Sequence, residues 1–278
     1  TARYTEEEIE ALKDIPWDKN VDPKTLEICF DNLCNLACSY CNSEFSSTWA
    51  RDIVVNGEYK NMETDGGKTY RQDGSIAMPF GNKNEGNIYV KRFFDWYLAV
   101  NSNLIMDDTR LARLLDAGKK FKKFDIYTSA ECIGKNQEFV RDGFIWDLWE
   151  KNVKEAVASP NINGVYIMMT VSLLGIWTVD KFVQQIVDWK KEQNDKHAFF
   201  MSVNILRFPS FQSVAMLPQD IKETLRKVDK SYEDVDSTAK KRNDLINFVD
   251  QYAVRRNKPI EDYMPEEFNN WYNSLKNG

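Results

Sequence analysis

Apolar and polar positions along the chain follow two periods that alternate from one segment to the next. Runs typical of buried strands cover Thr25–Phe30, Phe124–Ser129, Val165–Ser172 and Ala198–Leu206. Segments with the helical period cover Asp107–Ala117, Phe144–Val157 and Val179–Gln193. Because strands alternate with helices, we expect βα units that pair into a parallel sheet. The nearly continuous apolar runs at 165–172 and 198–206 predict strands buried on both faces.

The segments outside these strands and helices predict a short N-terminal helix, a polar insertion followed by a helix, and a helical C-terminal part. The capping box Thr5-Glu-Glu-Glu8 opens a short helix that ends near Lys13. Gly, Asn, Asp and Lys dominate residues 56–87, a long polar insertion, and a helix is expected over Lys91–Tyr97. From Pro218 onward the pattern is helical and charged, with helices expected near 218–229, 233–255 and 262–275. We therefore expect an α/β domain over 1–217, of partial-barrel type, and a helical extension over 218–278 packed on it.

Charge and hydropathy narrow the classes of function. The net charge of −6 and the pI of about 5.1 leave no broad basic footprint, so we do not expect nucleic acid as a partner. Small basic groups at 239–242 and 255–258 are typical of solvated helix faces. No apolar run approaches the roughly 20 residues of a membrane helix, and the first residues do not resemble a signal peptide. The expected location is the cytoplasm.

The cysteines supply the candidate chemistry. Three of the five, Cys34, Cys38 and Cys41, fall within eight residues, directly after the first expected strand. Such clustering favours metal over disulfides, and three thiolates leave one iron of a four-iron cubane open to a small molecule. A structural zinc site is the alternative, and it would need Cys29, Cys132 or the single histidine, His197, as its fourth ligand. Buried inert thiols are a further alternative.

The segment Cys34-Asn-Leu-Ala-Cys38-Ser-Tyr-Cys41 resembles the signature of the radical SAM superfamily. The residues that follow, Asn42–Trp49, resemble its twitch-type, organic-radical-activating subgroup. The resemblance implies a partial (βα)6 barrel, a [4Fe–4S] cluster on the three cysteines, and S-adenosylmethionine (SAM) as cosubstrate. It places Tyr40 near the adenine.

Three later segments resemble the strands that hold SAM in this superfamily. Val100–Leu104 resembles the strand whose polar end approaches the ribose, which implies roles for Asn101 and Asn103. The stretch containing Ser129, Glu131 and Arg141 resembles the one that holds the methionine moiety, and Asn204 lies on the strand expected to border the adenine. Ordinary alternatives are open. Ser129 could cap the next helix, Arg141 could pair with Asp142 or Asp147, and Asn103 could be a turn residue.

One element of the superfamily pattern is absent from the sequence. A Gly-Gly-Glu-Pro-like motif after the second strand gathers the SAM amino group, whereas Gly66-Gly67 is followed here by Lys68. The segment that the resemblance places between Tyr97 and Leu98 is also missing. Either this chain lacks a segment of the natural protein, or the protein is a reduced variant. No cysteine follows Cys132, so a single cluster is expected.

The resemblance implies reductive cleavage of SAM to a 5′-deoxyadenosyl radical that abstracts hydrogen from a substrate. A flavodoxin- or ferredoxin-like electron donor is expected, and a peptide, a nucleotide or a small molecule remains open as substrate. Cys132 is a candidate hydrogen donor to a product radical, with a packed thiol as the ordinary alternative. A non-catalytic metal-binding scaffold and a glycyl-radical activase are the competing functions.

Overall fold

A parallel four-stranded sheet forms the centre of the protein. The computed structural model describes residues 6–16, 18–19, 34–43, 45–64, 97–192, 198–217 and 239–277. The strands pair in the order β2-β3-β5-β6 and are β2 Tyr97–Asn101, β3 Lys123–Ser129, β5 Gly164–Val171 and β6 Ala198–Ile205. The expected α/β class and the three later strands are thus confirmed. Tyr97 is a strand residue, so the helix expected over Lys91–Tyr97 is wrong at its last position. Its other residues, and the strand expected at Thr25–Phe30, lie outside the described ranges.

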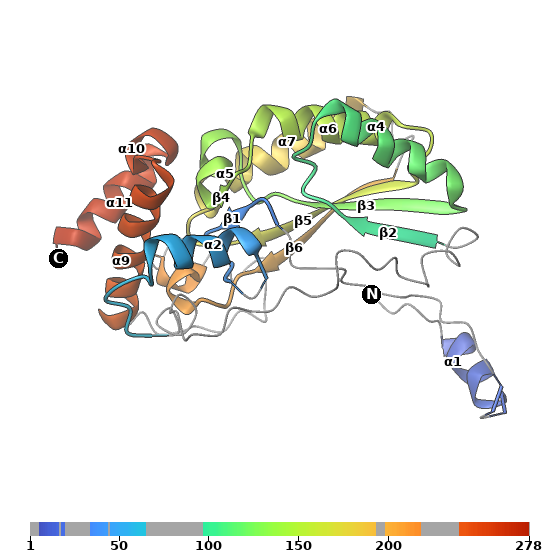
Figure 1. Ribbon diagram of the computed structural model, residues 1–278, viewed down its shortest axis with the longest axis horizontal. Helices are drawn as coiled ribbons and strands as arrows, with labels where there is room; N and C mark the ends of the chain where they lie inside the picture. Colours follow the sequence, from blue (N-terminus) through green and yellow to red (C-terminus); the bar gives the residue numbers. More distant parts are fainter. Residues whose placement is uncertain are drawn as a thin grey trace.

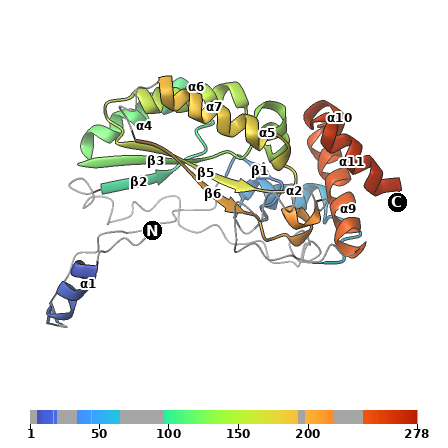
Figure 2. The ribbon, with the colours of Figure 1, turned by 180° about the vertical axis from the view of Figure 1, so that it is seen from behind.

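Three helices connect successive strands and cover one face of the sheet (Figure 1). They are α4 Asp108–Ala117, α6 Trp146–Ala158 and α7 Val179–Glu192. Figure 2 shows the same layer from behind. All three agree with the expected helices to within two residues. The short helix α5 Gly134–Val140, which the sequence pattern did not predict, precedes α6.

Burial alternates along the strands and corrects the expectation of strands buried on both faces. In β5 the side chains facing the helices, such as Val165 and Ile167, are buried, whereas Tyr166 and Met168 on the other face are half-buried. In β6 the exposed fraction reaches 47% at Phe200 and 52% at Val203. Among the described elements, the helices that connect the strands cover one face, and β6 pairs with a single strand, which explains the exposure.

Aromatic packing fastens the helices to the sheet. Trp149 of α6 is fully buried, and its indole N–H donates to the Thr128 hydroxyl of β3 at 3.0 Å. This bond satisfies the polar atom of a large core side chain. Phe182 of α7 packs against the same indole at a ring-centroid separation of 6.2 Å. The side of β3 that carries Thr128 is therefore the side facing the helices, and Tyr127 and Ser129 face away.

The C-terminal helices lie at the end of the molecule toward which all four strand arrows point (Figures 1 and 2). They are α9 Ala239–Arg256, α10 Ile260–Tyr263 and α11 Glu266–Asn277. The single helix expected near 262–275 is two helices, because Met264 is extended before Pro265. The helix expected near 218–229 lies outside the described ranges.

Among the described residues before the sheet, the chain forms three short elements. They are helix α1 Glu6–Lys13, strand β1 Ala37–Cys38 and helix α2 Ser47–Asn56. Strand β1 pairs antiparallel with β4 Arg141–Asp142, beside α2 and the C-terminal helices. The expected helix ending near Lys13 is confirmed, whereas α2 was not predicted. Among the residues that the structure describes, no helix has the length and apolar character that crossing a membrane requires.

Candidate functional site

The cysteine segment 34–41 lies at the carboxyl end of the sheet, as the sequence predicts. Strand β1 places Cys38 opposite Arg141 of β4, and the Ser39 amide donates to the Val140 carbonyl at 2.7 Å. Val140 is the last residue of α5, and Arg141 follows it directly. The register therefore ties the segment to the end of the helix that follows β3.

Helix α2, which follows the cysteine segment in the chain, fixes that segment through hydrogen bonds. Ser46 caps the helix by accepting from the Trp49 amide, and its hydroxyl donates to the Leu36 carbonyl at 2.8 Å. Thr48 donates to the carbonyl of Cys34 at 2.5 Å, and the Trp49 indole donates to the carbonyl of Cys38 at 2.9 Å. The cap and the first helical turn thus satisfy three carbonyl groups of the segment.

Two later parts of the chain also form hydrogen bonds with the cysteine segment. Tyr252 of α9 is fully buried and donates to the Ala37 carbonyl at 2.6 Å. Gln212, in the 3-10 turn Ser210–Gln212, donates to the Ser39 carbonyl at 2.8 Å. The backbone conformation of the segment is consequently fixed by contacts with residues distant in the sequence.

The three thiols differ in environment. Cys38 is buried and Cys34 and Cys41 are half-buried. Burial raises the pKa of Cys38 to about 12 and that of Cys41 to about 11, and neighbouring cysteines add smaller increases. Two donors approach the sulfur atoms: the Leu36 amide lies 3.5 Å from the Cys34 sulfur, and Nη1 of Arg141 lies 3.4 Å from that of Cys38. A bound metal would have to displace the thiol protons.

The donor set can be compared with what an iron–sulfur cluster requires. The three thiols come from one short segment, with Cys38 buried and Cys34 and Cys41 half-buried. A cubane takes one thiolate on each of its irons, so its ligands do not share a metal atom. N–H donors directed at the sulfurs tune the potential of such clusters. Cys34, Cys38 and Cys41 would hold the cluster.

Three of the predicted SAM contacts come together in a buried polar network. Glu131 is fully buried, and its carboxylate accepts from Nε of Arg141 at 2.8 Å and from the Tyr40 hydroxyl at 2.5 Å. Gln137 donates to the same carboxylate at 3.1 Å. Arg141 therefore pairs with Glu131 rather than with Asp142 or Asp147, and it links this network to Cys38. Glu131 neutralises the guanidinium.

Cys132 occupies a closed position behind this network. Its side chain is fully buried, and the thiol donates to Oε1 of Gln137 at 3.2 Å. Burial raises the pKa of this thiol well above its usual range. A hydrogen donor must reach the substrate, so this placement argues against the donor role and favours the packed thiol.

A pocket of about 900 Å³ opens beside the cysteine segment. Cys34 and Asn35 form one wall, and Asn101 and Asn103 at the end of β2 form another. Nδ2 of Asn103 donates to Oδ1 of Asn35 at 2.5 Å, which joins the two walls. Asn103 also accepts from the Ile105 amide at 3.0 Å, so it shapes a turn as well. The structure thus brings both predicted ribose contacts to the cavity that Cys34 lines.

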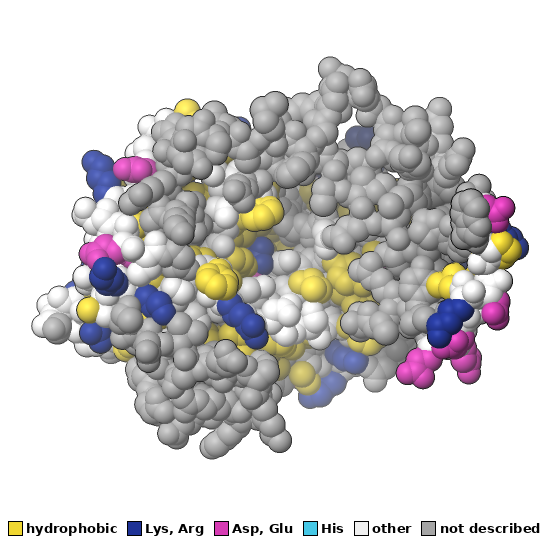
Figure 3. All heavy atoms as spheres, turned by 90° about the horizontal axis from the view of Figure 1, so that it is seen from below, with side chains coloured by type: hydrophobic (Ala, Val, Ile, Leu, Met, Phe, Trp, Pro, Cys, Tyr) yellow, Lys and Arg dark blue, Asp and Glu magenta, His cyan; other side chains and the backbone are white. Residues whose placement is uncertain are grey.

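The two remaining predicted contacts, Ser129 and Asn204, lie on the face of the sheet away from the helices. Register and alternation place them on the same face as Asn101. Ser129 does not cap α5, because no side chain makes the capping bond at the N-terminus of that helix. Figure 3, which views the molecule from this side, shows hydrophobic side chains in the middle of the view and Lys and Arg side chains near them.

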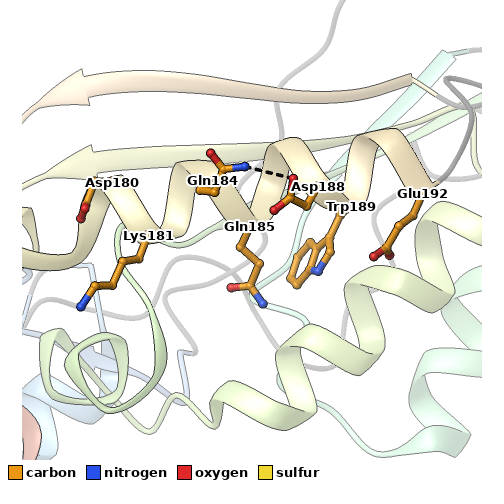
Figure 4. A pocket seen from close by; sticks show the side chains of 7 residues that line it. All are labelled: Asp180, Lys181, Gln184, Gln185, Asp188, Trp189 and Glu192. Carbon is orange, nitrogen blue, oxygen red and sulfur yellow. Dashed lines mark hydrogen bonds between the residues drawn. The ribbon is translucent and has the colours of Figure 1, made fainter.

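A second pocket, of about 620 Å³, lies along α7 in the helical layer (Figure 4). Acidic and amide side chains surround it, and Gln184 donates to Asp188 at 3.0 Å. None of the residues predicted for the site lines this pocket. The cavity beside Cys34 is therefore the candidate functional site.

The sequence did not predict the residues that hold the cysteine segment. Ser46, Trp49, Gln212 and Tyr252 are far apart in the chain and carry no motif. A usable signal was Ser46 before a stretch with helical spacing, which is typical of a cap. Comparison of the chain with family models, with curated proteins and with solved structures finds no match.

Proposed function

We propose that this protein binds a [4Fe–4S] cluster through Cys34, Cys38 and Cys41 and acts as a radical SAM enzyme. The observation that carries the proposal is the position of Cys34, on the wall of a large pocket that Asn101 and Asn103 also line. When bound, the cluster supplies the electron for reductive cleavage of SAM, which gives the 5′-deoxyadenosyl radical.

The arrangement of helices supports a partial barrel. Helices α4, α6 and α7 all cover the same face of a parallel sheet (Figure 1). A doubly wound sheet carries helices on both faces, whereas a barrel wall carries them on the outer face alone. The face of the sheet away from these helices, with Asn101, Ser129 and Asn204, would be the barrel interior.

The chain's own residues would orient the ligands. Asn101 and Asn103 offer amide groups to ribose hydroxyls, and Ser129 and Asn204 offer donors and acceptors on the same face of the sheet as Asn101. Arg141 donates to the Cys38 sulfur and is held by Glu131. The resemblance implies that Arg141 holds the methionine carboxylate. Since Glu131 already neutralises Arg141, this side chain is better suited to supporting the cluster.

The test is anaerobic reconstitution followed by incubation with SAM and dithionite. We expect 5′-deoxyadenosine, with substitution of Cys34, Cys38 or Cys41 by Ala abolishing it and Cys132→Ala retaining it. A protein that binds the cluster but yields no 5′-deoxyadenosine would contradict the enzyme proposal.

A non-catalytic scaffold is the second candidate. One observation favours it: Tyr40 and Arg141 donate hydrogen bonds to Glu131. The resemblance implies that these three residues contact SAM instead. The sequence also lacks the Gly-Gly-Glu-Pro-like motif. Zinc without iron in the purified protein would support this candidate.

A further inference from the structure

The pocket beside Cys34 carries an unusual charge for this acidic protein. Two arginines line it, Arg51 of α2 and Arg110 of α4, together with neutral polar and apolar side chains. Among the described residues of the lining, none is Asp or Glu. The chain as a whole has a net charge of −6, so a wall with two cations and no acid is not a sample of the average surface.

The acidic residues near these arginines in the sequence pair mainly with other groups. Asp108, two residues before Arg110, pairs with Lys151 at 2.5 Å. Asp52, next to Arg51, is buried and accepts from Arg256 at 2.9 Å and from Arg255 at 3.4 Å. Asp107 caps α4 by accepting from the Arg110 amide at 3.0 Å, and its contact with the Arg110 guanidinium is longer, at 3.5 Å, and exposed. An exposed pair of this kind contributes little. Arg51 has no ion-pair partner within the described ranges.

The spacing along both helices directs these side chains to one cavity. Ser47 and Arg51 are four residues apart on α2, and Arg110 and Leu114 are four apart on α4, so each pair shares a helix face. Two guanidinium groups over a polar wall are suited to a carboxylate or a phosphate.

We infer that this pocket binds a small substrate bearing a carboxylate or phosphate group, held by Arg51 and Arg110. The proposed function assigns Asn101 and Asn103 of this pocket to SAM, so the two arginines are assigned to a second, anionic ligand. A volume of about 900 Å³ lies at the upper end of the range for one small ligand and leaves room for a second. That the bound molecule is a substrate rests on the proposed function, whereas the binding of an anionic molecule does not.

The test is isothermal titration of the full, iron-free chain with inorganic pyrophosphate and, separately, with succinate. Neither iron nor SAM is present, so failure of this inference and failure of the enzyme proposal are distinguishable. We expect one-to-one binding of at least one probe, with the preferred probe identifying phosphate or carboxylate as the group recognised. Arg51→Gln and Arg110→Gln should each raise the Kd about tenfold, which corresponds to about 1.4 kcal/mol.

Arg113→Gln is the matched control, because Arg113 is exposed on α4 but does not line the pocket. It should bind like the wild type, and thermal melting should be unchanged in all three variants. Absence of binding by both probes at millimolar concentration would overturn the inference. So would an equal loss in Arg113→Gln, which would indicate diffuse surface charge.

Discussion

Replacing Glu131 by Gln tests whether the buried network beneath the cysteine segment is structural. Glu131 is fully buried and the Arg141 side chain is 11% exposed, so their charges meet in a nearly dry environment. The substitution keeps the shape of the side chain and removes its charge. Arg141 is then a buried cation without an anionic partner among its contacts.

The expected loss of stability follows from that uncompensated charge. Breaking one partner of a buried pair costs about 3–5 kcal/mol, because the other stays desolvated. For a chain of this size, each kcal/mol lowers the melting temperature by about 2–4 °C. We therefore expect the Tm to fall by about 6–20 °C. Glu150→Gln is the control, because it removes a surface pair with Lys154 that is worth at most about 1 kcal/mol.

The assays are thermal melting, which gives the Tm, and urea unfolding, which gives the free energy of unfolding. Both are followed by circular dichroism on the iron-free chain, with a double variant to identify the cause. Glu131→Gln combined with Arg141→Met removes both charges and should recover much of the lost stability, since buried pairs are often replaced by apolar residues at little cost. The reasoning is refuted if Glu131→Gln lies within about 1 kcal/mol of the wild type. It is equally refuted if the double variant is no more stable than the single one. Either result would return Arg141 to the role of a ligand contact.

Two further predictions concern the hold on the cysteine segment and the capping of α4. Tyr252→Phe leaves the buried Ala37 carbonyl without its donor, so the free energy of unfolding in urea should fall by about 1–3 kcal/mol. Tyr263→Phe on α10 is the control and should lie within about 0.5 kcal/mol of the wild type. Equal effects of the two substitutions would contradict the prediction. Asp107→Ala removes the cap of α4. Hydrogen bonding by the Arg110 amide lowers the pKa of Asp107, so its contribution is complete above the unfolded value of about 3.9 and is lost as the pH falls through the lower folded value. Thermal melts of both proteins between pH 7 and pH 2 should therefore converge in acid, and a gap that stays constant would contradict the assignment.

The sequence predicted the sheet and its connecting helices because both carry their own periodicity. The helix at Val179–Glu192, for example, has a clear apolar face that packs on the sheet. Burial was predicted less well: Phe200 and Val203 are apolar, but their exposure depends on which faces the helices cover. A single strand's composition does not contain that information.

The candidate site was likewise predictable from the sequence only in part. The spacing of Cys34, Cys38 and Cys41 could be read directly, and so could their place at the end of the sheet. The ion pair between Glu131 and Arg141 could not, because it depends on α5 turning the chain back between them. The hold by Tyr252 joins residues that are 215 positions apart, and no local pattern reports such a contact.

The most direct test of the central claim is the metal content of the three cysteine variants. After anaerobic reconstitution, the wild type and Cys132→Ala should each contain about four irons and four acid-labile sulfides per chain. Replacement of Cys34, Cys38 or Cys41 by Ala should lower both values severely and remove the electron paramagnetic resonance signal of the reduced cluster. One zinc per chain without sulfide in the wild type would contradict the claim, as would a loss in Cys132→Ala equal to that in the other three.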